Sequence, residues 1–379
     1  MTAVPSRGLS TPGPLTAVLR PQRHPSSPPT LRLLTRTDGD DSAQAVRLQP
    51  SRRRSALMPL LPVAYRGSYL RRLLAPRRPV ERALLSVIQE AYLSGNSTRT
   101  VDVLAETVGV PGSDPAVVET QARQWDQRVE AFRHRRLHEP LPYLMLAVTP
   151  ALVRRDGEAQ AVRLAIAVAT AESGARHVVG LAVAAADEMA GFWGSFLGDL
   201  GDRGLRGLQL VTSDQSDGLL PALAAAFPEA RWQRCREHFL SEALRLVPRA
   251  TRPAVEASLR TIFAEPDAET ALLSLDTVRT RFEPAYPEFA AALRGPVAAL
   301  VAHYEVPAAH RRLVSSLNGL ASVQRELRQS CELVGIFPNR RALLRLTGTI
   351  LQEVSEEWAA RPNVMRRRTR SGSIWAAAA

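Results

Sequence analysis

The sequence of 379 residues contains no lysine, only two cysteines and no long apolar run. Cys235 and Cys331 alone cannot form a disulfide framework, and so few thiols are compatible with a reducing cytoplasm. The longest apolar runs, such as residues 178–186, fall far short of the ~20 residues that span a bilayer. The N-terminus lacks the basic start and apolar stretch of a secretory signal. We therefore expect an intracellular protein that does not cross a membrane.

Because lysine is absent, arginine supplies all 49 basic residues, against 37 acidic ones, and the formal net charge is +12. The planar guanidinium group matches phosphate geometry, so this balance is typical of a polyanion binder. GC-rich coding explains an all-arginine set equally well. The composition does not separate these two explanations for any single arginine.

Two segments lack the periodicity of helices or strands. Residues 1–62 are rich in Pro, Ser, Thr and Arg, which predicts a disordered leader. Its triplet Arg52-Arg53-Arg54 could contact DNA phosphates, but a solvated tail is the simpler interpretation. Residues 366–379 form a tail that begins with another arginine triplet.

Region 63–138 has a helical pattern. Apolar spacing predicts helices from Pro79 to a stop at Gly95-Asn96, over Val101–Val108, and from Pro115 to about Phe132. Ser97 is expected to cap the second helix, and Gly109 to make the turn after it. Helix, glycine turn and helix outline a helix-turn-helix, so we predict a DNA-binding region, although any small helical bundle produces this pattern.

Residues 139–234 alternate between strand and helix patterns. The expected elements are strands at 141–148, 161–170 and 177–186, a helix at 192–200 and a strand at 208–211. The third strand is nearly all apolar, as a strand covered on both faces would be. This order, ending at Ser213-Asp214, matches the first part of a ribonuclease-H-like domain.

After Asp214 only helices are expected, at 219–227, 235–247, 252–264, 268–282, 311–330 and 340–360. We interpret 235–310 as a helical insertion and 311–365 as the closing helices of the core. The predicted fold class is α/β: a ribonuclease-H-like core with an all-α insertion, preceded by a small α-helical DNA-binding domain.

Several short motifs follow one another in order along residues 63–365. They are Tyr65-Arg66-Gly67-Ser68-Tyr69, Ile88-Gln89-Glu90-Ala91-Tyr92, Ser97-Thr98-Arg99, Leu210-Val211-Thr212-Ser213-Asp214, Trp232-Gln233-Arg234-Cys235-Arg236-Glu237-His238-Phe239, Asn318 and Val334-Gly335-Ile336-Phe337-Pro338-Asn339. Each alone is weak, but the ordered set is a strong signal. This segment resembles the bacterial Mutator-type insertion-sequence transposases. The leader and tail do not resemble the family, which fits a shifted or fused reading frame.

The resemblance implies a DDE transposase, in which two aspartates and one glutamate hold two Mg²⁺ or Mn²⁺ ions for attack on DNA phosphates. Carboxylates suit this chemistry because hard divalent cations prefer oxygen ligands. The resemblance also implies that the partner is DNA, namely the terminal inverted repeats of an insertion element. It further implies a homodimer that pairs two element ends in the bacterial cytoplasm, associated with the nucleoid.

Two of the three acid positions that the resemblance implies are alanine here. The first follows Pro142-Tyr143-Leu144-Met145-Leu146 and is Ala147. The second is Asp214, the surviving catalytic and metal-ligand candidate. The third, a glutamate of an Asn-Pro-Leu-Glu-Arg-like helix start, is Ala321 in Asn318-Gly319-Leu320-Ala321-Ser322. The family's metal site therefore lacks two ligands.

No other acid is expected to substitute. Glu326 follows Ala321 by five residues, which places it roughly 140° around a helix. Asp217 comes too soon after Asp214 to replace a ligand from another strand, and Asp156 belongs to an expected hairpin with Gly157. Asp214 itself could also cap a helix over the residues that follow it.

Cys235 and His238 have the spacing of half a zinc site, but a closed site needs about four ligands. We interpret them as a structural or active-site-shaping pair. Trp193 and Trp232 could stack on a DNA base, although filling the core is the simpler role for each.

The DNA-binding candidates are Arg99, Arg123, Arg234 and Arg236, with solvated surface as the alternative for the last two. Where the family has a Ser-x-x-x-Ser-Arg-like recognition pattern, this chain has Asp114 to Thr120 with two acids, which disfavours phosphate contact. The sequence therefore predicts a Mutator-type transposase that cannot cut DNA. A non-catalytic DNA-binding or multimerising regulator of a related transposase, and a pseudogene product, remain alternatives.

Overall fold

A computed structural model describes residues 78–95, 97–295 and 297–360. The expectations for the leader, the tail and the motif at 65–69 lie outside this part of the chain. Within it, no helix is long and apolar enough to cross a membrane.

The described part of the chain is built around a mixed sheet with strand order β3-β2-β1-β4-β5, and β6 also pairs with β1. The strands are β1 (Tyr143–Arg155), β2 (Glu158–Thr170), β3 (Arg176–Ala185), β4 (Leu210–Ser213), β5 (Arg231–Arg234) and β6 (Ile336–Phe337). The first three form an antiparallel meander, and β4, β5 and β6 run parallel to their partners. The hairpin predicted at Asp156-Gly157 is confirmed, and both residues have positive φ angles, 52° and 86°.

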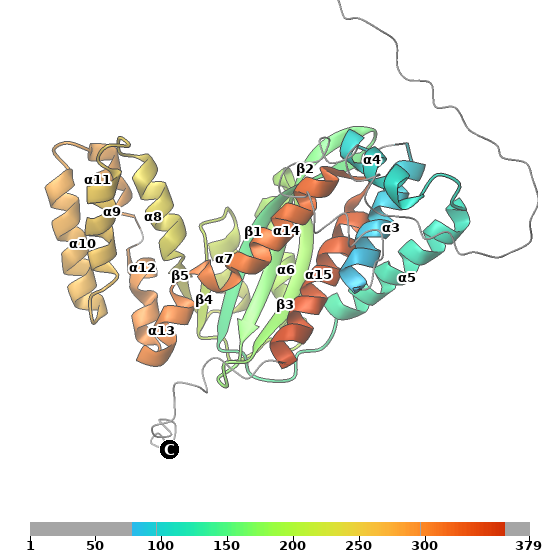
Figure 1. Cartoon of the computed structure of the whole chain (residues 1–379). Helices are drawn as coiled ribbons and strands as arrows, with labels where there is room; N and C mark the ends of the chain where they lie inside the picture. The colour runs from blue at the N-terminus through green and yellow to red at the C-terminus, as the bar shows by residue number, and fades with distance from the viewer. Residues whose placement is uncertain (1–77, 96, 296, 361–379) are drawn as a thin grey trace, which may run out of the picture. The chain divides into compact units, whose positions relative to one another are not determined.

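Helices cover both faces of this sheet (Figure 1). Side chains alternate across a strand, so Met145 and Ala147 of β1 face one cluster while Leu144 and Leu146 face the other. The first cluster contains residues of α14 (Ala321–Val334) and α15 (Arg340–Ala360). The second contains residues of α6 (Met189–Asp202) and α7 (Leu219–Ala226). The sheet is thus buried on both sides, as the apolar strand pattern predicts.

Three helices precede the sheet: α3 (Pro79–Leu93), α4 (Arg99–Val108) and α5 (Pro115–Arg133). All three were expected, and Gly109 ends α4 in the left-handed conformation with φ 77°. The expected cap at Ser97 is wrong: Thr98 is the N-cap, and its Oγ1 accepts a hydrogen bond from the N–H of Val101 at 3.3 Å. The Ser97 hydroxyl instead bonds Asp102.

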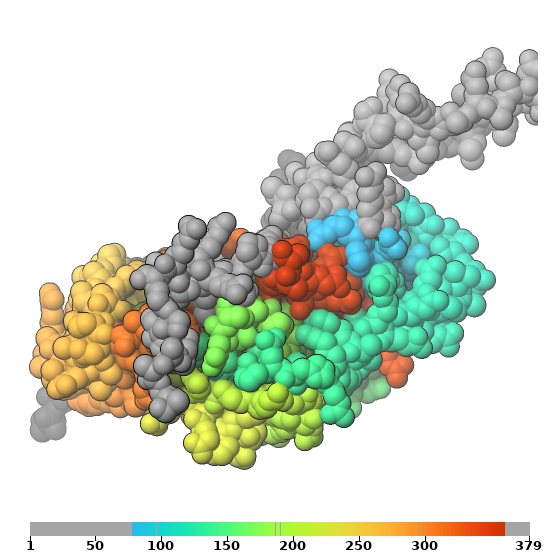
Figure 2. Space-filling model, turned by 90° about the horizontal axis from the view of Figure 1, so that it is seen from below, coloured from blue at the N-terminus to red at the C-terminus, as the bar shows by residue number. Residues whose placement is uncertain are grey.

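A helical segment with its own apolar cluster follows β5, and its yellow to orange atoms lie at the left of the described residues in Figure 2. Its helices are α8 (Arg236–Arg245), α9 (Arg252–Ile262), α10 (Ala268–Phe282), α11 (Pro287–Ala292) and α12 (Ala298–Val301), and α13 (Ala308–Val314) comes after it. Short 3₁₀ turns occur at η3 (Ala186–Glu188), η4 (Ala302–Glu305) and η5 (Leu317–Leu320). Helices α8, α9 and α10 were expected, and α13 overlaps the start of the helix expected at 311–330. Helices α11 and α12 were not expected.

Two expectations about the second half of the chain are wrong. Strands do recur after Asp214, because β5 and β6 each complete the sheet by pairing with β4 or β1. The helix expected at 311–330 is broken between Val314 and Ala321. The break has a tertiary cause: the Val314 carbonyl accepts from Thr212 of β4, and the N–H of Leu317 donates to Cys235 Sγ at 3.3 Å.

Candidate active site

The parallel pairing of β1 with β4 places Ala147 beside Asp214. The paired residues end at Met145 and Thr212, and two residues further along each chain stand Ala147 and Asp214. Two residues is one period of a strand, so both side chains stay on the sheet face that Met145 and Thr212 occupy. Ala147 is fully buried and Asp214, the first residue after β4, is half-buried.

The third position, Ala321, is the first residue of α14 and is exposed. The turn before it lies on β1, since a β-carbon added at Gly319 would be 3.7 Å from the sulfur of Met145. Leu320 and Val323, on either side of Ala321, belong to the same buried cluster as Ala147. The fold therefore brings the three positions that the resemblance predicts as acids to the same face of β1 and β4, which α14 covers.

Asp214 carries an unusual electrostatic environment for a carboxylate. Burial raises its pKa above the ordinary value, and nearby Glu242 acts in the same direction. His238 and Arg163 oppose this rise by favouring the charged form. The cap interpretation is wrong for α7, because that helix begins only at Leu219 with Gly218 as its N-cap. The dipeptide Asp217-Gly218 is a turn signal that could have predicted this irregular connection.

Cys235 links the end of β4 to the start of α14. Its N–H donates to the carbonyl of Ser213 at 2.7 Å, and its sulfur accepts from Leu317, three residues before the α14 N-cap. Burial opposes ionisation of this thiol, but hydrogen bonding with His238 and Leu317 outweighs burial, so the pKa of Cys235 lies below its ordinary value. The same contact with Cys235 raises the pKa of His238. The pair thus adjoins the candidate site.

The donor atoms present do not fit a pair of divalent cations. The three positions provide one carboxylate and two methyl groups. Across the described residues, no group of three or more His, Cys, Asp or Glu side chains is arranged to hold a metal ion. None of the other acids considered above joins these three positions. Asp156 is exposed in the hairpin and Asp217 is exposed before α7. Glu326 is half-buried, and its negative charge favours the charged form of Arg78.

Four buried polar atoms of this neighbourhood have no hydrogen-bond partner among the described residues: Thr149 Oγ1, Ser315 Oγ, Arg236 Nε and His238 Nδ1. Thr149 follows Ala147 by one strand period, and the carbonyl of Ser315 accepts from the N–H of Arg236 at 3.2 Å. The sequence interpretation missed both hydroxyls. Thr149 could have been found from its spacing to Ala147, whereas Ser315 depends on the tertiary break before α14.

The four arginine candidates fall into two kinds of environment. Arg99 and Arg123 are exposed on α4 and α5. Arg234 pairs with Glu242 and lies 5.1 Å from the Phe239 ring centroid, and Arg236 lies 5.3 Å from that of Phe263. The latter two are therefore half-buried side chains with internal contacts. Arg123 forms an exposed ion pair with Glu119 at 3.6 Å, and Arg99 is exposed on α4.

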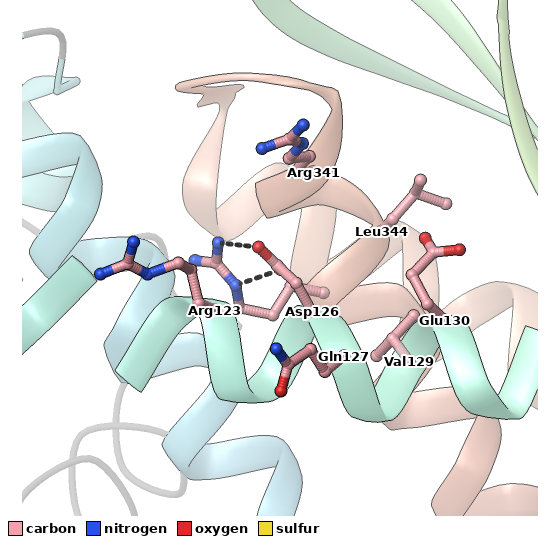
Figure 3. A pocket seen from close by; sticks show the side chains of 8 residues that line it. Arg123, Asp126, Gln127, Val129, Glu130, Arg341 and Leu344 are labelled. Carbon is pink, nitrogen blue, oxygen red and sulfur yellow. Dashed lines mark hydrogen bonds and ion pairs between the residues drawn. The ribbon is translucent and has the colours of Figure 1, made fainter. Parts of the chain in front are cut away.

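Arg123 lines a cavity of about 540 Å³ between α5 and α15, away from Asp214. Figure 3 shows its side chain extending away from Asp126, which is paired with Arg345. Both tryptophans contribute to the core, as the simpler interpretation held. Trp193 is 1% exposed and donates to Ser216, and Trp232 packs on the same cluster and donates to Ser213.

Comparison with known proteins identifies the family. The model of the family described as "Transposase, Mutator family" matches residues 54–361. The transposase for insertion sequence element IS1081 of Mycobacterium tuberculosis is 37% identical over 301 residues, which cover 79% of this chain and 72% of the relative. The IS406 transposase of Burkholderia multivorans is 35% identical over 281 residues, 73% and 72% of the two chains. The IS256 transposase in transposon Tn4001 of Staphylococcus aureus is 28% identical over the same shares. The chain belongs to the Mutator family of transposases.

Proposed function

We propose that this chain is a transposase whose ribonuclease-H-like core has lost the ability to cut DNA. The strand order β3-β2-β1-β4-β5, with an antiparallel meander followed by two parallel strands, supports the ribonuclease-H-like assignment. One observation supports the loss of cutting: a fully buried alanine, Ala147, lies beside Asp214 at the position where the resemblance predicts a second carboxylate.

A transposase of this class breaks phosphodiester bonds at element ends, and Mg²⁺ or Mn²⁺ would activate the attacking oxygen there. With methyl groups at two of three positions, the site does not fit those ions, and we assign no cutting step to this chain. The chain keeps the contacts that hold these three positions in place. Cys235 holds the β4 end against the start of α14, so carboxylates restored at Ala147 and Ala321 would meet Asp214.

The proposal includes a DNA partner, the terminal inverted repeats of an insertion element, and a homodimer that pairs two ends in the cytoplasm at the nucleoid. Helices α3, α4 and α5 are its DNA-binding part, with Arg99 and Arg123 exposed on them. The 37% identity to a protein named as an insertion-sequence transposase supports this partner.

The test is an end-cleavage assay on duplex DNA that carries a relative's terminal repeats, with Mg²⁺ or Mn²⁺. We expect Ala147→Asp/Ala321→Glu to cut and the natural chain not to. The matched control adds Asp214→Asn to the restored pair, which should abolish cutting if the three positions act together. Cutting by the natural chain would show that other carboxylates do the chemistry.

A second function is favoured by the intact packing around the altered positions. Ala147 sits in a closed apolar cluster, so the fold does not depend on the missing acids. Such a chain could occupy element ends and inhibit an active relative without cutting. In the same assay, adding the natural chain in excess should then slow cleavage by the restored protein, and an unchanged rate would count against this role.

A further inference from the structure

We propose that the exposed face of α14 is a binding surface for a DNA sugar-phosphate strand, leading from the acid positions toward α4. This inference rests on the proposed function and adds a location for DNA contact. Helix α14 is amphipathic. Its inner residues, Val323, Leu327, Cys331 and Val334, are buried against the sheet and neighbouring helices. Its outer face is not covered by another described element (Figure 1).

Two arginines follow Ala321 on that outer face. Arg325 and Arg328 lie four and seven residues after Ala321, so helical periodicity puts all three on one side, and all three are exposed. At about 1.5 Å per residue, Arg328 lies about 10 Å along the axis from Ala321, or about three nucleotides at ~3.4 Å each. A strand whose phosphate lies at the acid positions could therefore reach both guanidinium groups.

The charges of these two arginines are not paired by any side chain in the described part of the chain. Neither Arg325 nor Arg328 makes a hydrogen bond, ion pair or aromatic contact in the described part of the chain. Other exposed arginines do: Arg260 pairs with Glu256 and Arg294 with Glu283. Unpaired guanidinium groups beside an exposed site suit phosphate, which they bind through two parallel hydrogen bonds.

The surface continues beyond the end of α14. The Thr98 hydroxyl donates to the carbonyl of Val334 at 3.4 Å, which places exposed Arg99 next to the last turn. Glu332 is the exposed acid on this stretch. The half-buried Glu326 is near enough to Arg78 for its negative charge to favour the charged form of that arginine. Along the roughly 20 Å of α14 the exposed positions carry two arginines against one glutamate, and Arg99 adds a third positive charge beyond the last turn, an excess that suits a DNA strand.

The experiment measures binding of the full chain to a fluorescent duplex with terminal repeats, by anisotropy, between about 50 and 200 mM salt. The variant is Arg325→Gln/Arg328→Gln. Its matched control is Arg245→Gln/Arg249→Gln, which removes two exposed arginines at and just after the end of α8, also without partners in the described chain. Circular dichroism verifies that each variant folds.

We expect the α14 variant to bind about 10-fold or more weakly at low salt. Its log–log salt slope should fall by about 1.8, which is about 0.9 for each lost phosphate contact. The control should keep a slope close to that of the natural chain. Equal losses in both variants would mean that net charge alone matters and would overturn the inference.

A local measurement separates contact from general attraction. Ser322→Cys places a thiol on the exposed face, whereas the native cysteines are buried. A photo-cross-linker on this thiol should attach to DNA. One on Leu273→Cys should not, at a position on α10 where the native leucine is 64% exposed.

If the natural chain binds no DNA, the proposed function itself fails. If it binds but the α14 variant and cross-link behave like their controls, only this inference fails.

Discussion

Among single residues, His303 shows how burial sets protonation in this protein. It is 3% exposed, and its N–H and Nδ1 both contact Oε1 of the fully buried Gln233, at 2.7 and 3.0 Å. Gln233 in turn donates to the carbonyl of Leu300 at 3.1 Å, which ties β5 to α12. Burial, together with the positive charge of Arg236, lowers the pKa of His303 to about 4.

This depressed pKa predicts acid sensitivity. The unfolded chain takes up a proton near the ordinary pKa of 6.5 and the folded chain only near 4, so stability is complete above 6.5 and falls as pH drops toward 4. The loss would be about 3 kcal/mol at most. His303→Gln should flatten the pH dependence of urea unfolding between these values. The control is His134→Gln, at a side chain that is 56% exposed, and equal slopes for the two variants would contradict the prediction.

At the scale of elements, the contact between α5 and α15 is unusually close at Gly348. A β-carbon added there would overlap Val129 Cγ1 and lie 3.0 Å from Cγ2. One turn earlier, the buried Arg345 pairs with Asp126 of α5 and Glu90 of α3. Because glycine has no side chain, Gly348 allows the two helices to approach closely. The ion pairs of Arg345 fix how the helices are aligned along their length.

Gly348→Ala should therefore destabilise the protein by about 1–3 kcal/mol, because β-branched Val129 has little freedom to move aside. This loss would exceed the gain of roughly 0.5–1 kcal/mol that alanine normally brings within a helix. Val129→Ala in the same chain should recover part of the loss.

Gly198→Ala in α6 is the matched control for denaturant unfolding, since nothing lies within 4 Å of a β-carbon added at Gly198. A stabilising Gly348→Ala would show that α5 is not held against α15 in solution.

At the scale of the whole molecule, the helices before the sheet share its core. Leu84 and Ile88 of α3 and Leu104 of α4 belong to the same apolar cluster as Ile166 of β2 and Leu346 of α15. Helices α8 to α11, by contrast, pack in a cluster of their own. The proposed DNA-binding helices and the sheet therefore share one apolar core.

We expect α5 and β2 to unfold together, because Trp125 and Phe132 of α5 pack against the apolar cluster that contains Ile166 of β2. Native-state hydrogen exchange with mass spectrometry should give peptides from both elements the same opening free energy and the same denaturant dependence, as members of one cooperative unit. Peptides from α10 serve as the comparison because that helix belongs to the separate cluster. Loss of protection in α5 well before β2 would mean that the first helices open independently of the sheet.

Local chemistry was enough to predict much of the fold. Prolines at 79 and 115 mark helix starts, Asp156-Gly157 marks the hairpin, and runs of apolar residues mark the three long strands. Each of these signals depends on residues that are neighbours in sequence. The short strands β5 and β6 carry no such signal, because two to four residues form a strand only when β4 or β1 offers a pairing edge.

The same division holds for the candidate site. The sequence by itself determined the family and the residue types at the three positions predicted as acids: Ala147, Asp214 and Ala321. Only the tertiary structure decided that Ala147 lies beside Asp214, that Asp214 does not cap α7, and that Cys235 binds the chain just before α14. These contacts join residues far apart along the chain, and strand register and packing, which no local pattern encodes, bring them together.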